Sequence, residues 1–174
     1  MKIKYPAIIF FTLIIFAVAL PIVYYPQLPD KIASHFNASG RADGWESKNS
    51  FIIFQIGITL FLSILFGILA FLIPKFPKSI VSLPNKDYWL NEENRAEAYG
   101  LIQKFLLWFG SITIAFITLT FQETLSANLS GEYKLSSRFW IYFAAFIFAT
   151  ILYVIKFILH FSRKNIPKLT DKIK

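Results

Sequence analysis

Four long apolar runs limit the fold of this chain more than any other feature. They cover residues 5–25, 51–73, 101–121 and 139–161, and each contains at least 21 residues. A helix of about 20 residues crosses the hydrocarbon core of a bilayer. Hydrophobic residues make up 56% of the chain and charged residues only 16%, which is too apolar for an ordinary soluble domain. We therefore predict an all-α membrane protein, a single bundle of four transmembrane helices.

The basic residues outside the apolar runs predict the orientation of the chain. Because the number of spans is even, both termini and the middle loop lie on one side. That side carries 11 lysines and arginines, against 5 on the other, so the positive-inside rule places both termini in the cytoplasm and residues 28–48 outside. The first set is Lys2, Lys4, Lys75, Lys78, Lys86, Arg95, Arg163, Lys164, Lys168, Lys172 and Lys174, and the second is Lys31, Arg41, Lys48, Lys134 and Arg138.

Several classes of function find no support in the sequence. The chain has no cysteine, which excludes disulfides, thiolate catalysis and cysteine-ligated metals. No nucleophilic elbow, metalloprotease motif or phosphate-binding glycine loop occurs, so we predict neither an enzyme nor a cofactor. The formal charge of +8 does not indicate nucleic acid, because the basic residues flank the apolar runs. Lys156 lies inside a run but near its cytoplasmic end, where it can reach the interface, which argues against a pump.

One polar stretch, residues 28–48, is the candidate recognition site. It contains turn dipeptides and residues that tolerate positive φ, and we assign the turn geometry to Pro29, Gly40 and Gly44. Aromatic side chains would supply apolar contact, and charged side chains would set charge complementarity. The stretch is therefore predicted to form a structured extracytoplasmic loop. Its predicted ligand-binding residues are Asp30, His35, Phe36, Asn37, Arg41, Asp43, Trp45 and Lys48.

Two other interpretations of this loop stay open. His35 together with Asp30 and Asp43 could bind a divalent metal, but a single histidine without cysteine is a weak ligand set, and we predict no metal. Alternatively the same residues brace the loop, with the aspartates at turns and the histidine bonded to backbone.

The loop also carries a family resemblance, in the ordered residues Leu28-Pro29-Asp30, Ile32, His35-Phe36-Asn37, Gly40, Asp43, Trp45 and Lys48. This order resembles the signature of the DUF1648 family, small bacterial membrane proteins that include the SdpI-type immunity proteins. Residues 85–89 resemble a second segment found in many members, whereas Ala33 stands where the family usually has a second proline. The resemblance implies a bacterial inner membrane and, for SdpI-type proteins, protection against a secreted toxic peptide and sequestration of a transcriptional repressor.

The second apolar run has a polar face. Gln55, Thr59, Ser63 and Gly67 recur every four residues and so fall on one side of a helix. Helices in lipid associate through small residues and interhelical hydrogen bonds. This stripe therefore predicts a helix-packing interface, within the bundle or with another membrane protein.

Further expectations concern the connections. Pro74, Pro77 and Pro84 should end the second span, and Asn91 should cap a surface helix over residues 92–104 that leads into the third span. Residues 122–138 read as a short polar loop, and the basic tail 163–174 should rest on anionic headgroups. The first run reads as a retained span rather than a cleaved signal peptide.

Two functional hypotheses follow. The first is a non-catalytic immunity or signal-receptor protein that recognises an extracytoplasmic peptide or envelope component through residues 28–48. The second is a permease-like or regulatory subunit that docks to a partner membrane protein through the stripe on the second span, with a purely structural loop. Expected partners are the lipid bilayer, an extracytoplasmic peptide, a membrane-protein partner or second copy, and a cytoplasmic repressor, but not nucleic acid.

Overall fold

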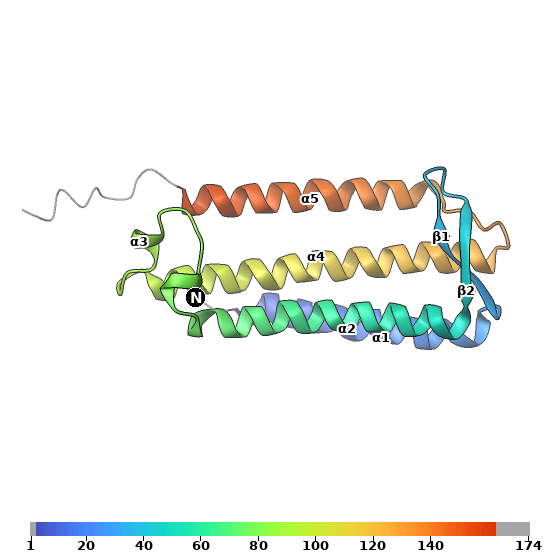
Figure 1. Cartoon of the computed structure of the whole chain (residues 1–174), viewed down its shortest axis with the longest axis horizontal. Helices are drawn as coiled ribbons and strands as arrows, with labels where there is room; N and C mark the ends of the chain where they lie inside the picture. Colours follow the sequence, from blue (N-terminus) through green and yellow to red (C-terminus); the bar gives the residue numbers. More distant parts are fainter. Residues whose placement is uncertain (1–2, 163–174) are drawn as a thin grey trace, which may run out of the picture.

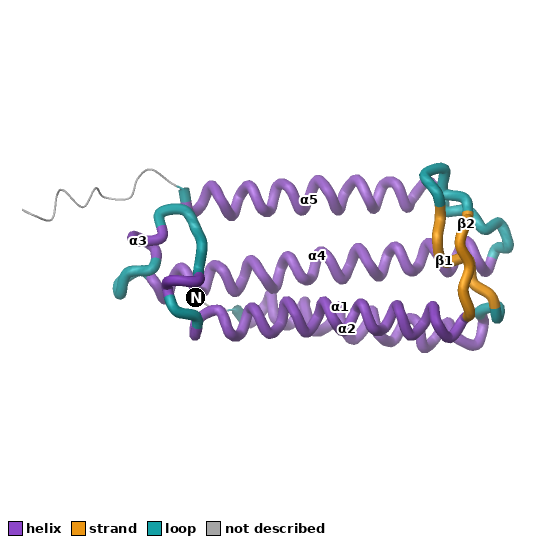
Figure 2. Tube along the Cα trace, viewed as in Figure 1, coloured by secondary structure: helices purple, strands orange, loops and turns teal. Residues whose placement is uncertain are grey.

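The computed structural model describes residues 3–162 and contains four long helices and one hairpin (Figure 1). Each long helix is apolar enough to cross a membrane, which confirms the predicted four-span bundle. The hairpin lies at one end of the bundle and the short helix α3 at the other (Figure 2). The elements are α1 (Lys4–Tyr24), η1 (Tyr25–Gln27), β1 (Lys31–Phe36), β2 (Ala42–Ser47), α2 (Lys48–Leu72), η2 (Ile73–Lys75), η3 (Lys78–Ile80), α3 (Lys86–Trp89), α4 (Arg95–Leu129) and α5 (Ser137–Phe161).

Helices α1, α2 and α4 form a closely packed unit. Gly110 of α4 marks the closest approach, because a Cβ added there would lie 2.7 Å from a ring carbon of Phe10 and 2.9 Å from Cβ of Phe66. Phe10 of α1 is fully buried, as are Leu107 and Ile114 of α4. Small residues let helix backbones approach closely in lipid, and here one glycine makes room for two phenylalanines.

The polar stripe on α2 faces the inside of this unit. Gln55, Thr59 and Ser63 are buried, and Gly67 lies against the ring of Phe10. The hydroxyls of Thr59 and Ser63 donate hydrogen bonds to carbonyls of their own helix, at 2.8 and 2.6 Å. This face of α2 therefore meets its neighbours by close packing, and its hydroxyl groups do not bridge between helices.

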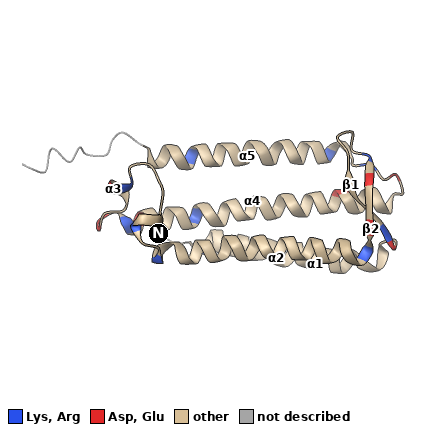
Figure 3. Cartoon of the chain, viewed as in Figure 1, with Lys and Arg blue, Asp and Glu red and all other residues tan. Residues whose placement is uncertain are grey.

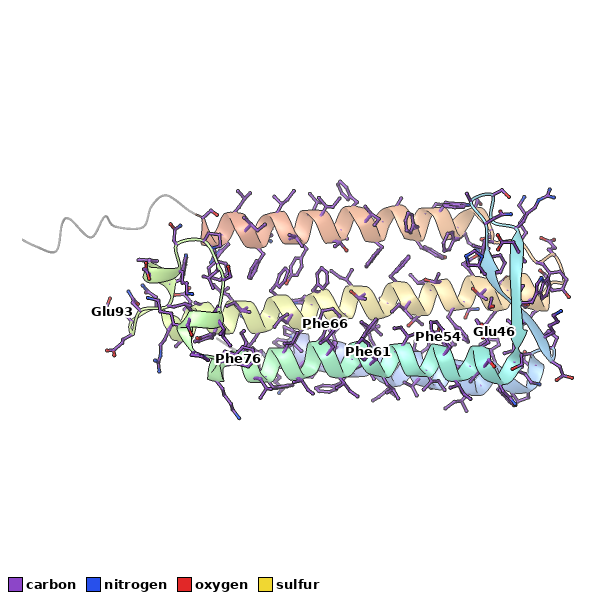
Figure 4. All side chains as sticks on the ribbon, viewed as in Figure 1. Glu46, Phe54, Phe61, Phe66, Phe76 and Glu93 are labelled. Carbon is purple, nitrogen blue, oxygen red and sulfur yellow. The ribbon has the colours of Figure 1, made fainter. Side chains whose placement is uncertain are left out.

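Helix α5 packs against α4 through aromatic rings. Phe105 of α4 lies 5.0 Å from the ring of Tyr153 and 4.1 Å from that of Phe157, and Phe116 stacks on Phe146 at 4.2 Å. Side chains of both helices reach into the space between the two ribbons (Figure 4). Within α5, all of which the structure describes, only Phe161 is buried. The outward side of α5 is thus left to lipid.

The second family-like segment, residues 85–89, holds the end of α5. The side chains of Asn85 and Trp89 both donate hydrogen bonds to the carbonyl oxygen of Phe161, at 2.9 and 3.0 Å. That carbonyl belongs to the last turn of α5, where no further helical N–H reaches it. The loop containing α3 therefore caps the C-terminus of α5.

Helix α4 corrects two predictions. The expected helix over residues 92–104 forms only from Arg95 and is no separate surface helix, because α4 runs unbroken from Arg95 to Leu129. Asn91 accepts a hydrogen bond from the N–H of Asn94, at 2.8 Å, as a capping residue does, in the turn that leads into the helix. The expected loop from residue 122 is helical up to Leu129, since its polar side chains Glu123, Thr124 and Asn128 are buried beneath the hairpin. Tertiary contacts here override the polar composition.

The ends of the bundle hold most of the charged residues (Figure 3). Helix α2 ends at Leu72, just before Pro74, as the prolines predicted. The basic tail predicted to rest on headgroups, residues 163–174, lies outside the described residues.

Candidate functional site

The predicted recognition loop is an antiparallel β-hairpin. Its turn is built by Asn37, whose side-chain oxygen accepts hydrogen bonds from the N–H groups of Ser39 (2.9 Å) and Arg41 (3.2 Å). Gly40 completes the turn with a φ of +75°, a conformation that glycine adopts at low cost. Asn37 and Gly40 thus have a structural place in the turn.

Position 44 must be glycine, because the opposite strand leaves no room for a side chain there. It pairs with His35 at an irregularity in the register, and a Cβ at Gly44 would lie 2.7 Å from the Cβ of His35. The His35 ring turns outward and its Nδ1 hydrogen-bonds to a carboxylate oxygen of Asp43. These two predicted site residues therefore form one exposed polar pair on the hairpin.

Asn128 of α4 fixes the hairpin to the bundle. Its side-chain oxygen accepts the N–H of Ala33 at 2.8 Å, and its side-chain nitrogen donates to the carbonyl of Ala33 at 3.0 Å. The amide acts as a short extra strand along the free edge of β1, and both residues are buried. A proline at position 33 could not make the first bond, which gives Ala33 a role in this chain.

Sequence reasoning missed Asn128 because it lies beyond the apolar run, among residues read as a loop. The available signal was spacing: Thr124 and Asn128 stand four residues apart, a helical interval, past the end of the third run. No feature of a single sequence indicated that the hairpin would cover them.

A short segment after α4 pairs with the tip of the hairpin. The N–H of Leu135 donates to the carbonyl of Gly40 at 2.8 Å, and the N–H of Ala42 donates to the carbonyl of Tyr133 at 3.0 Å. Residues 133–135 thereby begin a third strand along the edge of β2 that faces away from β1. We call residues 28–48 and 130–136 together the cap.

The outer edge of β2 is open beyond Ala42. Within residues 3–162 no other segment pairs with this edge. Ala33 and Trp45 lie directly opposite each other. Since both main-chain groups of Ala33 bind Asn128, on the side away from β2, this pair exchanges no hydrogen bonds, and the N–H and C=O of Trp45 point to the open edge.

Aromatic groups stand beside this edge. The rings of Trp45 and Tyr133 meet edge to face at 4.7 Å, and the ammonium group of Lys31 lies 6.0 Å from the Trp45 ring. Trp45 is 41% exposed and Tyr133 38%. The cap therefore presents an aromatic pair next to unpaired backbone groups.

Lys48 and Asp30 lie at the base of the hairpin. The Lys48 ammonium donates to the carbonyl of Leu28 at 3.2 Å, lies 3.5 Å from a carboxylate oxygen of Asp30, and sits over the ring of Tyr25 at 4.8 Å. Its side chain is only 19% exposed. Lys48 thus fastens the entrance of the hairpin, whereas Asp30 is exposed.

The remaining predicted residues do not gather into one cluster. Arg41 is exposed at the turn, and Pro29 is exposed before β1. Phe36 is half-buried and lines a cavity of about 330 Å³ between β1 and the adjoining ends of α4 and α5. Among the described residues, no three histidine, aspartate or glutamate side chains are placed to hold a metal ion.

A larger cavity of about 590 Å³ lies where the hairpin tip meets the α4–α5 connection. Its floor includes Glu123, which is nearly fully buried and was not predicted as a site residue. The Glu123 carboxylate accepts a hydrogen bond from the hydroxyl of Ser136 and lies 3.3 Å from Nε of Arg138. Ser39 of the hairpin and Ser130 and Ser137 also line this polar cavity.

Comparison with known proteins adds one finding. No curated protein and no solved structure matches the chain. One family model, described as a domain of unknown function, matches residues 12–60, which comprise the end of α1, the hairpin and the first half of α2. Residues 12–60 are therefore a DUF1648 domain.

Proposed function

We propose that this chain is a non-catalytic receptor or immunity protein of the bacterial inner membrane, and that its cap binds an extracytoplasmic peptide. The observation that carries the proposal is the open outer edge of β2 beside Trp45 and Tyr133. An extended peptide can add to such an edge through main-chain hydrogen bonds, while pockets for its side chains give specificity.

The geometry supports one register of binding. Residues 133–135 already occupy the place of a third strand next to Gly40 and Ala42. A peptide strand would continue that line along Asp43–Ser47, with its backbone facing the free groups of Trp45. The Trp45 and Tyr133 rings would receive an apolar side chain of the peptide.

Contacts within the chain hold the cap in place. Asn128 binds the middle of β1, Lys48 fastens the base, and residues 133–135 hold the tip. A site that is ordered beforehand loses less conformational entropy when the ligand binds. This rigidity favours recognition by the cap over a purely passive connection.

The docking alternative has little exposed surface on its predicted stripe. Gln55, Thr59 and Ser63 are buried inside the chain, and Gly67 is half-buried in an apolar groove between α1 and α2. No observation on the described residues favours a second function over peptide recognition.

Binding to the edge can be tested with paired variants of Trp45. The full chain in lipid nanodiscs is screened against a displayed library of random peptides, and the enriched peptides are titrated. Trp45→Ala removes the ring, whereas Trp45→Pro also removes the N–H at the open edge, a position where a strand tolerates proline. Binding should weaken in Trp45→Ala and be lost in Trp45→Pro, with unchanged elution in size-exclusion chromatography.

Either of two results contradicts the proposal: no peptide enriched on the wild type, or equal affinity for the wild type and Trp45→Pro. The orientation has its own test, because the chain contains no cysteine. Ala38→Cys, at the exposed turn, should react with a membrane-impermeant maleimide on intact cells. Labelling only after lysis would place the cap in the cytoplasm and exclude an extracytoplasmic ligand.

A further inference from the structure

A second cavity lies far from the cap, between α4 and α5 near the end that holds α3. Its volume is about 280 Å³, and it brings together Lys104 of α4 and Lys156 of α5. Figure 3 shows one basic band on each of these helices at the same level near that end. The other lining residues are Leu101, Phe105, Trp108, Tyr153, Phe157, His160 and Phe161.

The charges in this cavity have no partner among residues 3–162. Neither Lys104 nor Lys156 makes an ion pair or a hydrogen bond there, and no acidic residue lines the cavity. The Nε2 atom of His160 is buried and has no hydrogen-bond partner in the same part of the chain. Two cations without an acidic partner therefore line one small space.

The walls of the cavity are apolar and aromatic. Phe105 stacks on Tyr153 at 5.0 Å and meets Phe157 at 4.1 Å, so rings form the side that continues toward the membrane centre. Trp108 is 36% exposed at the same place. The cavity thus offers positive charge at the end of the spans and hydrocarbon-compatible surface next to it, which is the arrangement of charge and hydrocarbon in a lipid.

We propose that this cavity binds an anionic phospholipid, with the phosphate between Lys104 and Lys156 and the acyl chains against the aromatic rings. Basic pockets between transmembrane helices bind anionic headgroups in this way. A free phosphate ion would share the charge recognition but would leave the aromatic walls unused. The proposal does not depend on peptide binding at the cap.

The test uses the full chain in detergent, with phosphatidylglycerol as the probe and native mass spectrometry as the readout. The variant is Lys104→Gln/Lys156→Gln. The matched control is Lys4→Gln/Lys75→Gln, which removes two exposed lysines of the same end outside the cavity. Each lysine of the cavity is expected to contribute about fivefold, so the affinity of the double variant should fall about 25-fold and that of the control much less.

Further measurements distinguish a bound phospholipid from a free phosphate ion and control for misfolding of the variant. Phosphatidylcholine should bind more weakly than phosphatidylglycerol, and inorganic phosphate should not displace the lipid. Lys104→Arg/Lys156→Arg keeps both charges and should restore binding. Equal loss in the control pair, equal binding of the two lipids, or displacement by inorganic phosphate would each overturn the proposal.

Discussion

Helix α4 meets its neighbours in two different ways on its two sides. Toward α1, α2 and the hairpin it offers Gly110 and Asn128, which allow close packing and buried hydrogen bonds. Toward α5 it offers Phe105 and Phe116, whose rings keep the helices apart. A small residue and a hydrogen-bonding residue make the contacts on the side of α1, α2 and the hairpin, and large aromatic residues make them on the side of α5.

This difference explains the cavities on the α5 side of α4. Lipid tails are as apolar as leucine, so helices in a membrane gain little from hiding apolar surface and depend on packing and hydrogen bonds. Rings cannot fill the space between α4 and α5 evenly. The cavities of about 280, 330 and 590 Å³ are all lined by residues from both α4 and α5, and two of them also by hairpin residues. A further, apolar groove of about 690 Å³ lies between α1 and α2, so the α5 side of α4 holds these three cavities but not every hollow of the bundle.

The largest loss of stability is expected from removing the Asn128 side chain, on the closely packed side of α4. Asn128→Ala leaves the buried N–H and C=O of Ala33 without partners, at an expected cost of about 3 kcal/mol. Hydrogen exchange should show faster exchange of the Ala33 amide, with the helices still protected. Unchanged exchange at Ala33 would mean that Asn128 does not hold the hairpin.

The next largest loss of stability is expected from a larger side chain at Gly110. Gly110→Leu forces a side chain into the space of Phe10 and Phe66 and should cost about 2 kcal/mol, measured by reversible unfolding in mixed detergent micelles. Ala145→Leu, on the exposed side of α5, is the matched control and should change the unfolding midpoint little. Equal effects of the two variants would abolish the contrast between the two sides of α4.

A change on the ring side should matter less. Phe105→Leu keeps an apolar side chain but removes the ring pairs with Tyr153 and Phe157, and about 1 kcal/mol is expected. The same unfolding measurement applies. A loss larger than that of Gly110→Leu would show that rings, rather than close packing, stabilise this bundle.

The smallest effect concerns an ion pair outside the spans. Lys78 donates a hydrogen bond to Asp87 at 2.8 Å, and this lowers the pKa of the carboxyl below its ordinary value of 3.8. A carboxyl group whose pKa is lowered by folding stabilises the folded state at pH values above its ordinary pKa. This contribution is lost as the pH falls through the pKa of the folded state. Because the pair is exposed, Asp87→Asn should leave the unfolding midpoint unchanged at neutral pH. A measurable shift would give this loop a stabilising role.

The spans could be predicted because lipid imposes long apolar runs whatever their partners. The turn could also be predicted, since Asn37 and Gly40 act locally. The strands could not: β1 is short, its Ile32 and Ala33 are adjacent buried residues, and its pairing depends on Asn128, which is distant in the chain. The cavities could not be predicted for the same reason, because they form between two helices and the segments that connect them.

The unbroken course of α4 has a mechanical consequence. A helix of 35 residues is about 52 Å long, which exceeds the hydrocarbon thickness of a bilayer. Asn128 near one end grips the hairpin, and Lys104 toward the other faces the basic cavity, so a single rod joins the two leaflets. If a peptide binds the hairpin as proposed, any tilt of the hairpin would act on the same helix that lines the basic cavity.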